Sequence, residues 1–106
     1  DFSDVRDVVE RYVHLLLDAE DVAGQTFNVC SGQAHSLREI MALTEQLSGH
    51  SLDIRVNPAF VRANEVPRLL GSAARLQQYL GPFSPIPMKQ TLRWMLDGRS
   101  RLLPRF

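Results

Sequence analysis

An arginine and a glutamate three residues apart are the pair in this chain best suited to bind a ligand. Arg62 and Glu65 lie in the segment from Asn57 to Ser72, NPAFVRANEVPRLLGS. A guanidinium is a planar fork that meets two phosphate oxygens at once, which a lysine cannot do. A carboxylate accepts hydrogen bonds from a sugar diol. The competing interpretations are a surface ion pair between Arg62 and Glu65, and a glutamate that tethers the loop through backbone amides.

The segment that carries this pair is a long irregular connection, and such connections in small domains are usually functional or disordered. Its apolar side chains argue against a solvated linker, so we expect a loop packed on the body of the domain that presents Arg62 and Glu65 at a cleft. Arg55 and Arg68 could add positive potential near this cleft, although solvated side chains are the favoured interpretation for both. The apolar residues in question are Phe60, Val61, Val66, Leu69 and Leu70.

Other chemistry-bearing residues point to no second site. The three histidines, His14, His35 and His50, have no metal-ligand spacing, and the single Cys30 has no C-x-x-C partner. We therefore predict neither a metal site nor a cysteine nucleophile. Ser31-Gly32 lacks the flanking glycine of a nucleophile elbow.

Composition limits the class of protein. The chain has 106 residues, the size of one domain, with 12 basic and 12 acidic side chains and a formal net charge of zero. This balance provides no long-range field to attract nucleic acid, and no apolar run is long enough to cross a membrane. The chain has a lone cysteine and no signal peptide, so we expect a cytoplasmic protein. Since Asp1 opens directly on a structured pattern without an initiating Met, we expect a fragment or a processed chain.

The elements that must position these residues are predicted from periodicity and capping signals. Apolar spacing from Val5 to Leu16 predicts a first helix, capped by Asp4 or Asp7 and covered on more than one side. Ser36 and Glu39 form a capping box for a second helix that ends at Gly49. The others are a third helix from Ser72 to Gly81, a fourth from about Pro87 to Asp97, strands at Gln25–Cys30 and Leu52–Val56, and a frayed basic tail over 99–106. Four helices and two short strands predict an α-rich α+β fold.

Four motifs give the chain a family resemblance over nearly its whole length. Arg62-Ala63-Asn64-Glu65-Val66-Pro67 resembles the R-P-x-E-V segment of the extended short-chain dehydrogenase/reductases, the NAD-dependent epimerase/dehydratase family, which act on nucleotide sugars. The other three follow in the family's order: Asp1–Val8, Phe27–Gly32, and Leu80-Gly81 with Pro85-Ile86-Pro87. The resemblance is greatest to the branch of GDP-4-dehydro-6-deoxy-D-mannose reductases. Two positions depart from the family pattern: Ala63 replaces the usual proline and Pro82 replaces an aromatic residue.

The resemblance implies that residues 1–106 are a single C-terminal, sugar-nucleotide-binding portion of an enzyme with a Rossmann-type fold. The intact enzyme would reduce the C4 ketone of a GDP-4-keto-6-deoxyhexose with NAD(P)H, with Arg62 on the diphosphate and Glu65 on the ribose. It would be a homodimer or a higher oligomer. The Gln25–Cys30 strand would belong to a main sheet whose other strands lie outside this chain.

The catalytic centre itself is not in this chain. The sequence has no glycine-rich turn for a dinucleotide, so the N-terminal dinucleotide-binding domain is expected elsewhere. The family's Tyr-x-x-x-Lys pair is also missing, because Leu16 follows Tyr12 and Phe83 follows Tyr79 at the lysine position. We therefore predict substrate-binding residues but no catalytic residue.

Two alternatives remain open on the sequence alone. The chain could be part of a GDP-mannose 4,6-dehydratase or of a nucleotide-sugar epimerase. In a different class, it could be a non-catalytic module whose exposed apolar face binds a partner chain.

Overall fold

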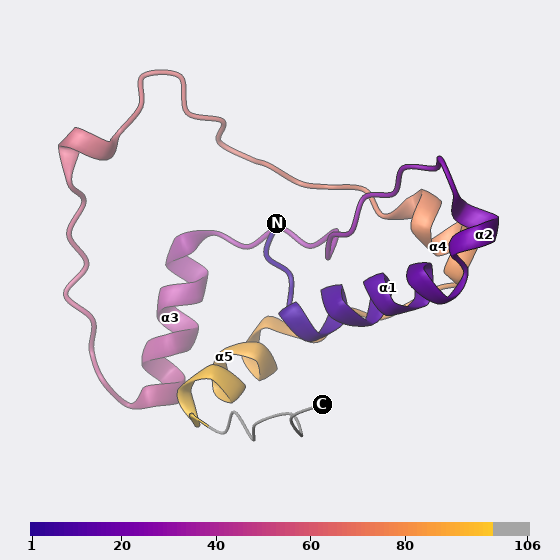
Figure 1. Ribbon diagram of the computed structural model, residues 1–106. Coiled ribbons are helices and arrows are strands. Elements are labelled where there is room, and N and C mark those ends of the chain that lie inside the picture. The colour runs from indigo at the N-terminus through magenta and orange to yellow at the C-terminus, as the bar shows by residue number, and fades with distance from the viewer. Residues whose placement is uncertain (99–106) are drawn as a thin grey trace.

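The described part of the protein is a set of helices joined by long irregular connections. The computed structural model describes residues 1–98, and the basic tail predicted to fray lies outside that range. The helices are α1 (Val5–Leu17), α2 (Ala19–Val22), α3 (Leu37–Ser48), the 3₁₀ turn η1 (Pro58–Phe60), α4 (Ala74–Leu80) and α5 (Met88–Leu96) (Figure 1). The four predicted helices are therefore confirmed, and α2 is an additional short one.

Local capping explains where the two long helices begin and end. Asp4 caps α1 by accepting from the backbone N–H of Arg6 at 2.8 Å. Ser36 and Glu39 make the predicted capping box at the start of α3, and Gly49 closes that helix in the left-handed region at φ 72°. At α4 the predicted cap is displaced: the helix begins at Ala74, with the Ser72 hydroxyl 3.5 Å from its backbone nitrogen.

The prediction of an α+β fold is wrong, because residues 1–98 contain no strand. Gln25–Cys30 and Leu52–Val56 have the side-chain pattern of strands but are irregular chain. A strand exists only where a neighbouring backbone completes its hydrogen-bond ladder. Neither segment has such a neighbour within the described residues, so their pattern alone does not make a sheet.

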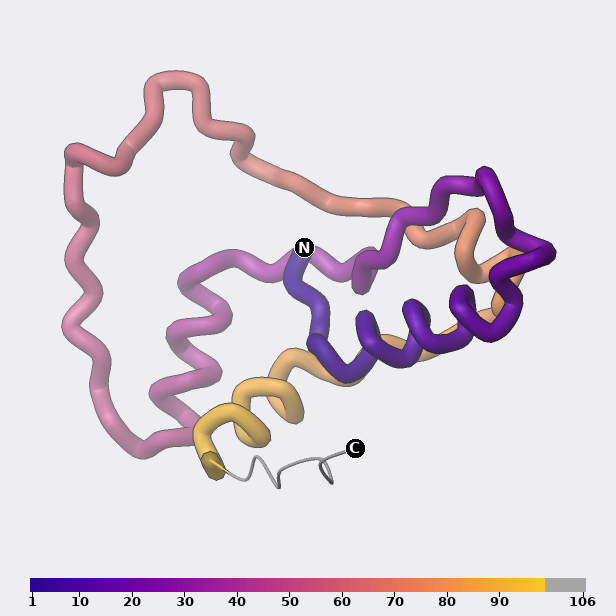
Figure 2. The backbone as a smooth tube through the Cα atoms, viewed as in Figure 1, coloured from indigo at the N-terminus to yellow at the C-terminus, as the bar shows by residue number. Residues whose placement is uncertain are grey.

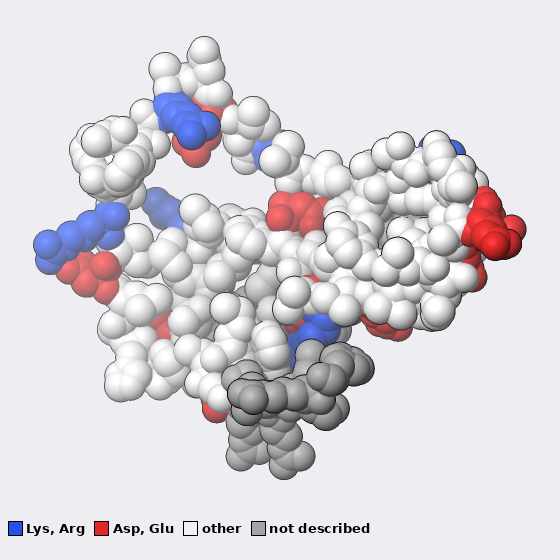
Figure 3. Space-filling view, in the orientation of Figure 1, with Lys and Arg blue, Asp and Glu red and all other residues white. Residues whose placement is uncertain are grey.

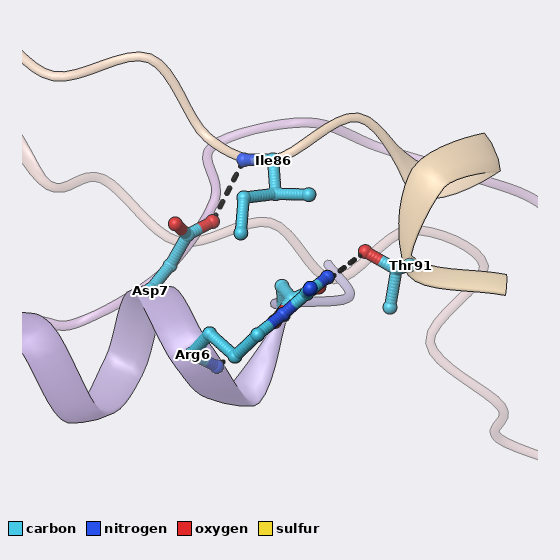
Figure 4. Close-up of polar contacts among 5 residues, drawn as sticks. Arg6, Asp7, Ile86 and Thr91 are labelled. Atoms are coloured by element: carbon cyan, nitrogen blue, oxygen red, sulfur yellow. Dashed lines mark hydrogen bonds and ion pairs between the residues drawn. The ribbon is translucent and has the colours of Figure 1, made fainter. Parts of the chain in front are cut away.

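The helices lie in two groups, which meet where the start of α1 contacts α5 (Figures 1 and 2). In one group α3 packs against α5, and in the other α1 lies beside α2, with the end of α4 facing the same pocket as α1. Asp7 of α1 accepts a hydrogen bond from the backbone N–H of Ile86, just before α5, at 2.8 Å (Figure 4). Thr91 of α5 donates to Asp4 at 2.6 Å, so the start of α1 is fixed to α5 twice.

The described residues bury little apolar surface. Leu76 is the fully buried large side chain, and the radius of gyration is 17.2 Å, against about 13 Å for a compact domain of this length. The accessible surface is 8995 Å², whereas a folded monomer of 12.0 kDa exposes about 6,000 Å². The expectation that α1 is covered on more than one side is therefore wrong within this chain: an apolar stripe along the helix is open, formed by Val5, Val9, Tyr12, Val13, Leu16 and Leu17.

None of the helices described in residues 1–98 combines the length and apolar character required to cross a membrane.

Candidate functional site

The segment that carries Arg62 and Glu65 stands off the helices as an extended arm, which we define as residues 50–70. Every residue of the arm is exposed. Its apolar side chains are open as well, with Phe60 81% and Leu69 77% exposed, so the expected packing of this loop on the body is wrong. Figure 3 shows an opening between the arm and the rest of the molecule. These side chains lack a surface to pack on because the described helices do not reach them.

Short-range contacts shape the arm at one point. Asn57 accepts from the backbone N–H of Ala59 at 3.0 Å and so caps η1, whose first residue is Pro58. Proline fits this position because it lacks the amide hydrogen that a helix start leaves unpaired. The chain then runs as an irregular segment through Arg62 and Glu65.

Arg62 and Glu65 have no polar partner among residues 1–98. Neither side chain forms a hydrogen bond or an ion pair with the residues from 1 to 98. The two competing interpretations, a mutual ion pair and a tether to backbone amides, are therefore absent from this structure. Figure 3 shows basic and acidic atoms together at the crest of the arm. An unpaired guanidinium and an unpaired carboxylate can bind an anion and a diol, respectively.

The other two arginines considered from the sequence differ in their surroundings. Arg55 pairs with Asp53 at 2.6 Å on the exposed arm, so its charge is already balanced. Arg68 lines a groove of about 340 Å³ between the end of the arm and the start of α3. Two carboxylate-bearing residues face the same groove, so it is not uniformly positive. The groove is lined by Asp1, Ala34, His35, Ser36, Glu39, Pro67, Arg68 and Leu69.

The acids near these elements serve the structure. Hydrogen bonds from Ser36 hold the pKa of Glu39 below its usual value. Asp4 is buried, and the hydrogen bond from the Arg6 side chain is the main reason that its pKa lies far below the ordinary 3.8, with Thr91 adding to the effect and burial opposing it. Arg6 also stacks on Trp94, with 4.4 Å from its guanidinium carbon to the ring centroid. The side chains of Asp4 and Arg6 thus join α1 to α5, and Glu39 caps α3.

No metal or coenzyme site is built from the described residues. Residues 1–98 contain no group of three or more His, Cys, Asp or Glu side chains able to hold a metal ion. The nicotinamide coenzyme that the resemblance implies does not fit this chain, because its six glycines, at 24, 32, 49, 71, 81 and 98, lack the spacing of a dinucleotide turn. We therefore assign no part of such a coenzyme's chemistry to these residues.

One residue that the sequence did not single out has a central position. Asp1 lies where the arm returns to the body, between the turn at Ser31-Gly32 and Gly71. Apart from Ser3, its partners are 30 to 70 residues away in sequence, so no local pattern could have indicated these contacts.

The chain is similar to segments of three known proteins, although no protein-family model matches it. It is 42% identical over 103 residues to the GDP-6-deoxy-D-mannose reductase of Pseudomonas aeruginosa, covering 96% of this chain and 33% of that protein. It is 30% identical over 79 residues to the GDP-6-deoxy-D-talose 4-dehydrogenase of Aggregatibacter actinomycetemcomitans, covering 74% and 25%.

A solved structure gives the same result in three dimensions. The crystal structure of a protein described as an epimerase, from Burkholderia cenocepacia, superposes with a TM-score of 0.85 at 46% identity, over 92% of this chain and 32% of that one. The chain thus spans a quarter to a third of the length of the relatives it matches. It belongs to the extended short-chain dehydrogenase/reductase family.

Proposed function

We propose that this chain is the sugar-nucleotide-binding part of an enzyme that reduces the C4 ketone of a GDP-4-keto-6-deoxyhexose with NAD(P)H. The observation that carries the proposal is the similarity to two enzymes whose names specify GDP-6-deoxyhexoses, one of them a 4-dehydrogenase. The share of those proteins that the chain spans fits a binding part rather than a whole enzyme. Homodimer or higher assembly and a cytoplasmic location stay predictions.

In this proposal the exposed arm binds the nucleotide. Arg62 meets the diphosphate through its free guanidinium, and Glu65 accepts hydrogen bonds from the ribose hydroxyls. Neither group has a partner in residues 1–98, so binding the nucleotide breaks no existing contact there. Fixing the nucleotide at a distance from the ketone helps catalysis, because it supplies the orientation that a free substrate lacks.

The dinucleotide-binding part and the catalytic residues are then supplied by another domain. The open apolar stripe of α1 and the excess accessible surface of about 3,000 Å² support a second body that covers them. The Gln25–Cys30 segment, which has no neighbouring strand within residues 1–98, would pair with a strand of that domain. We call the chain joined to this domain the assembled enzyme.

Titration of the assembled enzyme with GDP tests the role of Arg62. Since a charge-assisted hydrogen bond contributes about 1.5–3 kcal/mol, Arg62→Ala should raise the dissociation constant by about 10- to 100-fold. Arg55→Ala is the matched control, because Arg55 is on the same arm but is paired with Asp53. An unchanged dissociation constant for Arg62→Ala would refute the proposal that Arg62 binds the diphosphate.

The role of Glu65 has its own probe. If Glu65 binds the ribose diol, wild type should prefer GDP over 2′-deoxy-GDP, and Glu65→Gln should reduce that preference. A preference that survives the substitution intact would assign the ribose to another residue.

An epimerase is the second candidate function, favoured by the structural similarity to the protein from Burkholderia cenocepacia. The products distinguish the two. A reductase consumes NAD(P)H in proportion to ketone, whereas an epimerase converts one sugar nucleotide into its epimer without net consumption of the coenzyme.

A further inference from the structure

The carboxylate of Asp1 joins three separate stretches of the chain. One oxygen accepts from the backbone N–H and the hydroxyl of Ser31, at 3.1 and 2.6 Å. The other accepts from the backbone N–H of Gly32 at 3.0 Å and of Gly71 at 3.3 Å. The backbone nitrogen of Asp1 also donates to the carbonyl of Leu69 at 2.8 Å. One residue thus holds the returning end of the arm against the Ser31-Gly32 turn.

The arm has few other attachments. At its start, the Glu45 carboxylate accepts from the backbone N–H of Leu52 at 2.6 Å. Beyond its end, Asn28 donates to the carbonyl of Ser72 at 3.3 Å. Every residue from 50 to 70 is exposed, so the anchors determine where Arg62 and Glu65 lie.

A carboxylate suits this position better than any neutral side chain. The five groups that face it are three backbone N–H donors and the hydroxyls of Ser31 and, at 3.5 Å, Ser3, and an ionised carboxylate offers acceptors alone. An asparagine of the same shape would turn an NH₂ donor toward one pair of these donors. Close approach at the same place is possible because Gly71 has no Cβ, which would lie 2.7 Å from the Cys30 sulfur.

We propose that Asp1 is a positioning residue for the nucleotide-binding arm: it fixes the arm's returning end and thereby sets the placement of Arg62. This inference rests on the proposed function, since it assigns Asp1 an effect on the same nucleotide. It concerns how the arm is held and not which group contacts the ligand.

The test is GDP titration of the assembled enzyme carrying Asp1→Asn, alone and combined with Arg62→Ala. We expect Asp1→Asn to raise the dissociation constant by about 10-fold in the wild-type background, and to have little effect once Arg62 is removed, because residues that act through each other are not additive. Asp53→Asn is the control, since that exposed acid of the arm contacts Arg55 and neither anchor. Ser31→Ala removes the 2.6 Å bond to Asp1 together with the contacts of the same hydroxyl to the backbone of Gln33, and it leaves the Asp1 carboxylate in place. It should give a smaller rise and serves if Asp1→Asn folds poorly.

The outcomes separate the inference from the proposed function. Equal rises in both backgrounds would mean general disruption and would overturn the positioning role. If neither Asp1→Asn nor Ser31→Ala raises the dissociation constant for GDP while Arg62→Ala still does, the inference about Asp1 is overturned and the proposed function stands. An Arg62→Ala variant that binds GDP normally would overturn both.

Discussion

The hydroxyl of Thr91 donates to the carboxylate of Asp4 at 2.6 Å, across 87 residues of sequence. The same carboxylate caps α1 and accepts from the side chain of Arg6, at 2.9 and 2.6 Å. It is 3% exposed, in a chain that buries few side chains. This contact therefore holds the start of α1 against α5.

Asp4→Ala should lower the free energy of unfolding of the assembled enzyme by about 2–4 kcal/mol, because it removes a helix cap and charge-assisted hydrogen bonds together. Thr91→Val is the milder partner variant, with an expected loss of about 1 kcal/mol, since Asp4 keeps Arg6. Denaturant titration measures both. A larger loss for Thr91→Val than for Asp4→Ala would contradict the central place given to the carboxylate.

The contribution of Asp4 should depend on pH. Its folded pKa lies below the ordinary 3.8, so the unfolded chain takes up the proton first as the pH falls. The stabilisation is therefore fully present above the ordinary value and is lost as the pH falls from there through the folded pKa. The difference between the denaturant midpoints of wild type and Asp4→Asn, measured from pH 7 to pH 3, should stay constant down to the ordinary value of 3.8 and begin to narrow below it. A difference that grows toward acid pH would reverse this sign.

Gly71→Ala should destabilise the returning end of the arm. The added methyl would lie 2.7 Å from the sulfur and 2.9 Å from the Cβ of Cys30, closer than packed atoms tolerate. We expect a loss of about 1–3 kcal/mol in the assembled enzyme. Cys30→Gly removes both contacted atoms, so the double variant should be more stable than the sum of the single losses implies. Simple additivity, measured by thermal unfolding, would mean that the two residues do not meet.

The open stripe of α1 should make the isolated 106-residue chain bind a hydrophobic dye and self-associate, because so much apolar surface has no cover. Leu16→Ser with Leu17→Ser should reduce both signals, since these side chains are 73% and 78% exposed. Gln78→Ser, an exposed polar position on α4, is the control. Dye fluorescence and size-exclusion chromatography are the measurements. A monomeric wild-type chain that leaves the dye dark would instead favour a self-sufficient module.

The long helices α1, α3 and α5 could be predicted because the causes of their ends are local, whereas the start of α4 was displaced and α2 was missed. The Ser36–Glu39 capping box and the left-handed Gly49 depend on residues a few positions apart, and the structure has both. Periodicity likewise placed α1 and α5 correctly. The strand predictions failed for the opposite reason: the alternating pattern of Leu52–Val56 describes side chains, whereas a strand is made by a neighbouring backbone.

For the candidate site, the residue types could be read directly from the amino-acid sequence: an arginine and a glutamate three residues apart, in a segment too apolar for a linker. Tertiary structure alone decided that this segment stands off as an arm, that Arg68 lines a groove with α3, and that Asp1 ties Gly71 to Ser31. The physical reason is separation along the chain. A helix cap closes within one turn, but the contacts of Asp1 that hold the returning end of the arm join residues 30 to 70 positions apart and exist only once the chain has folded.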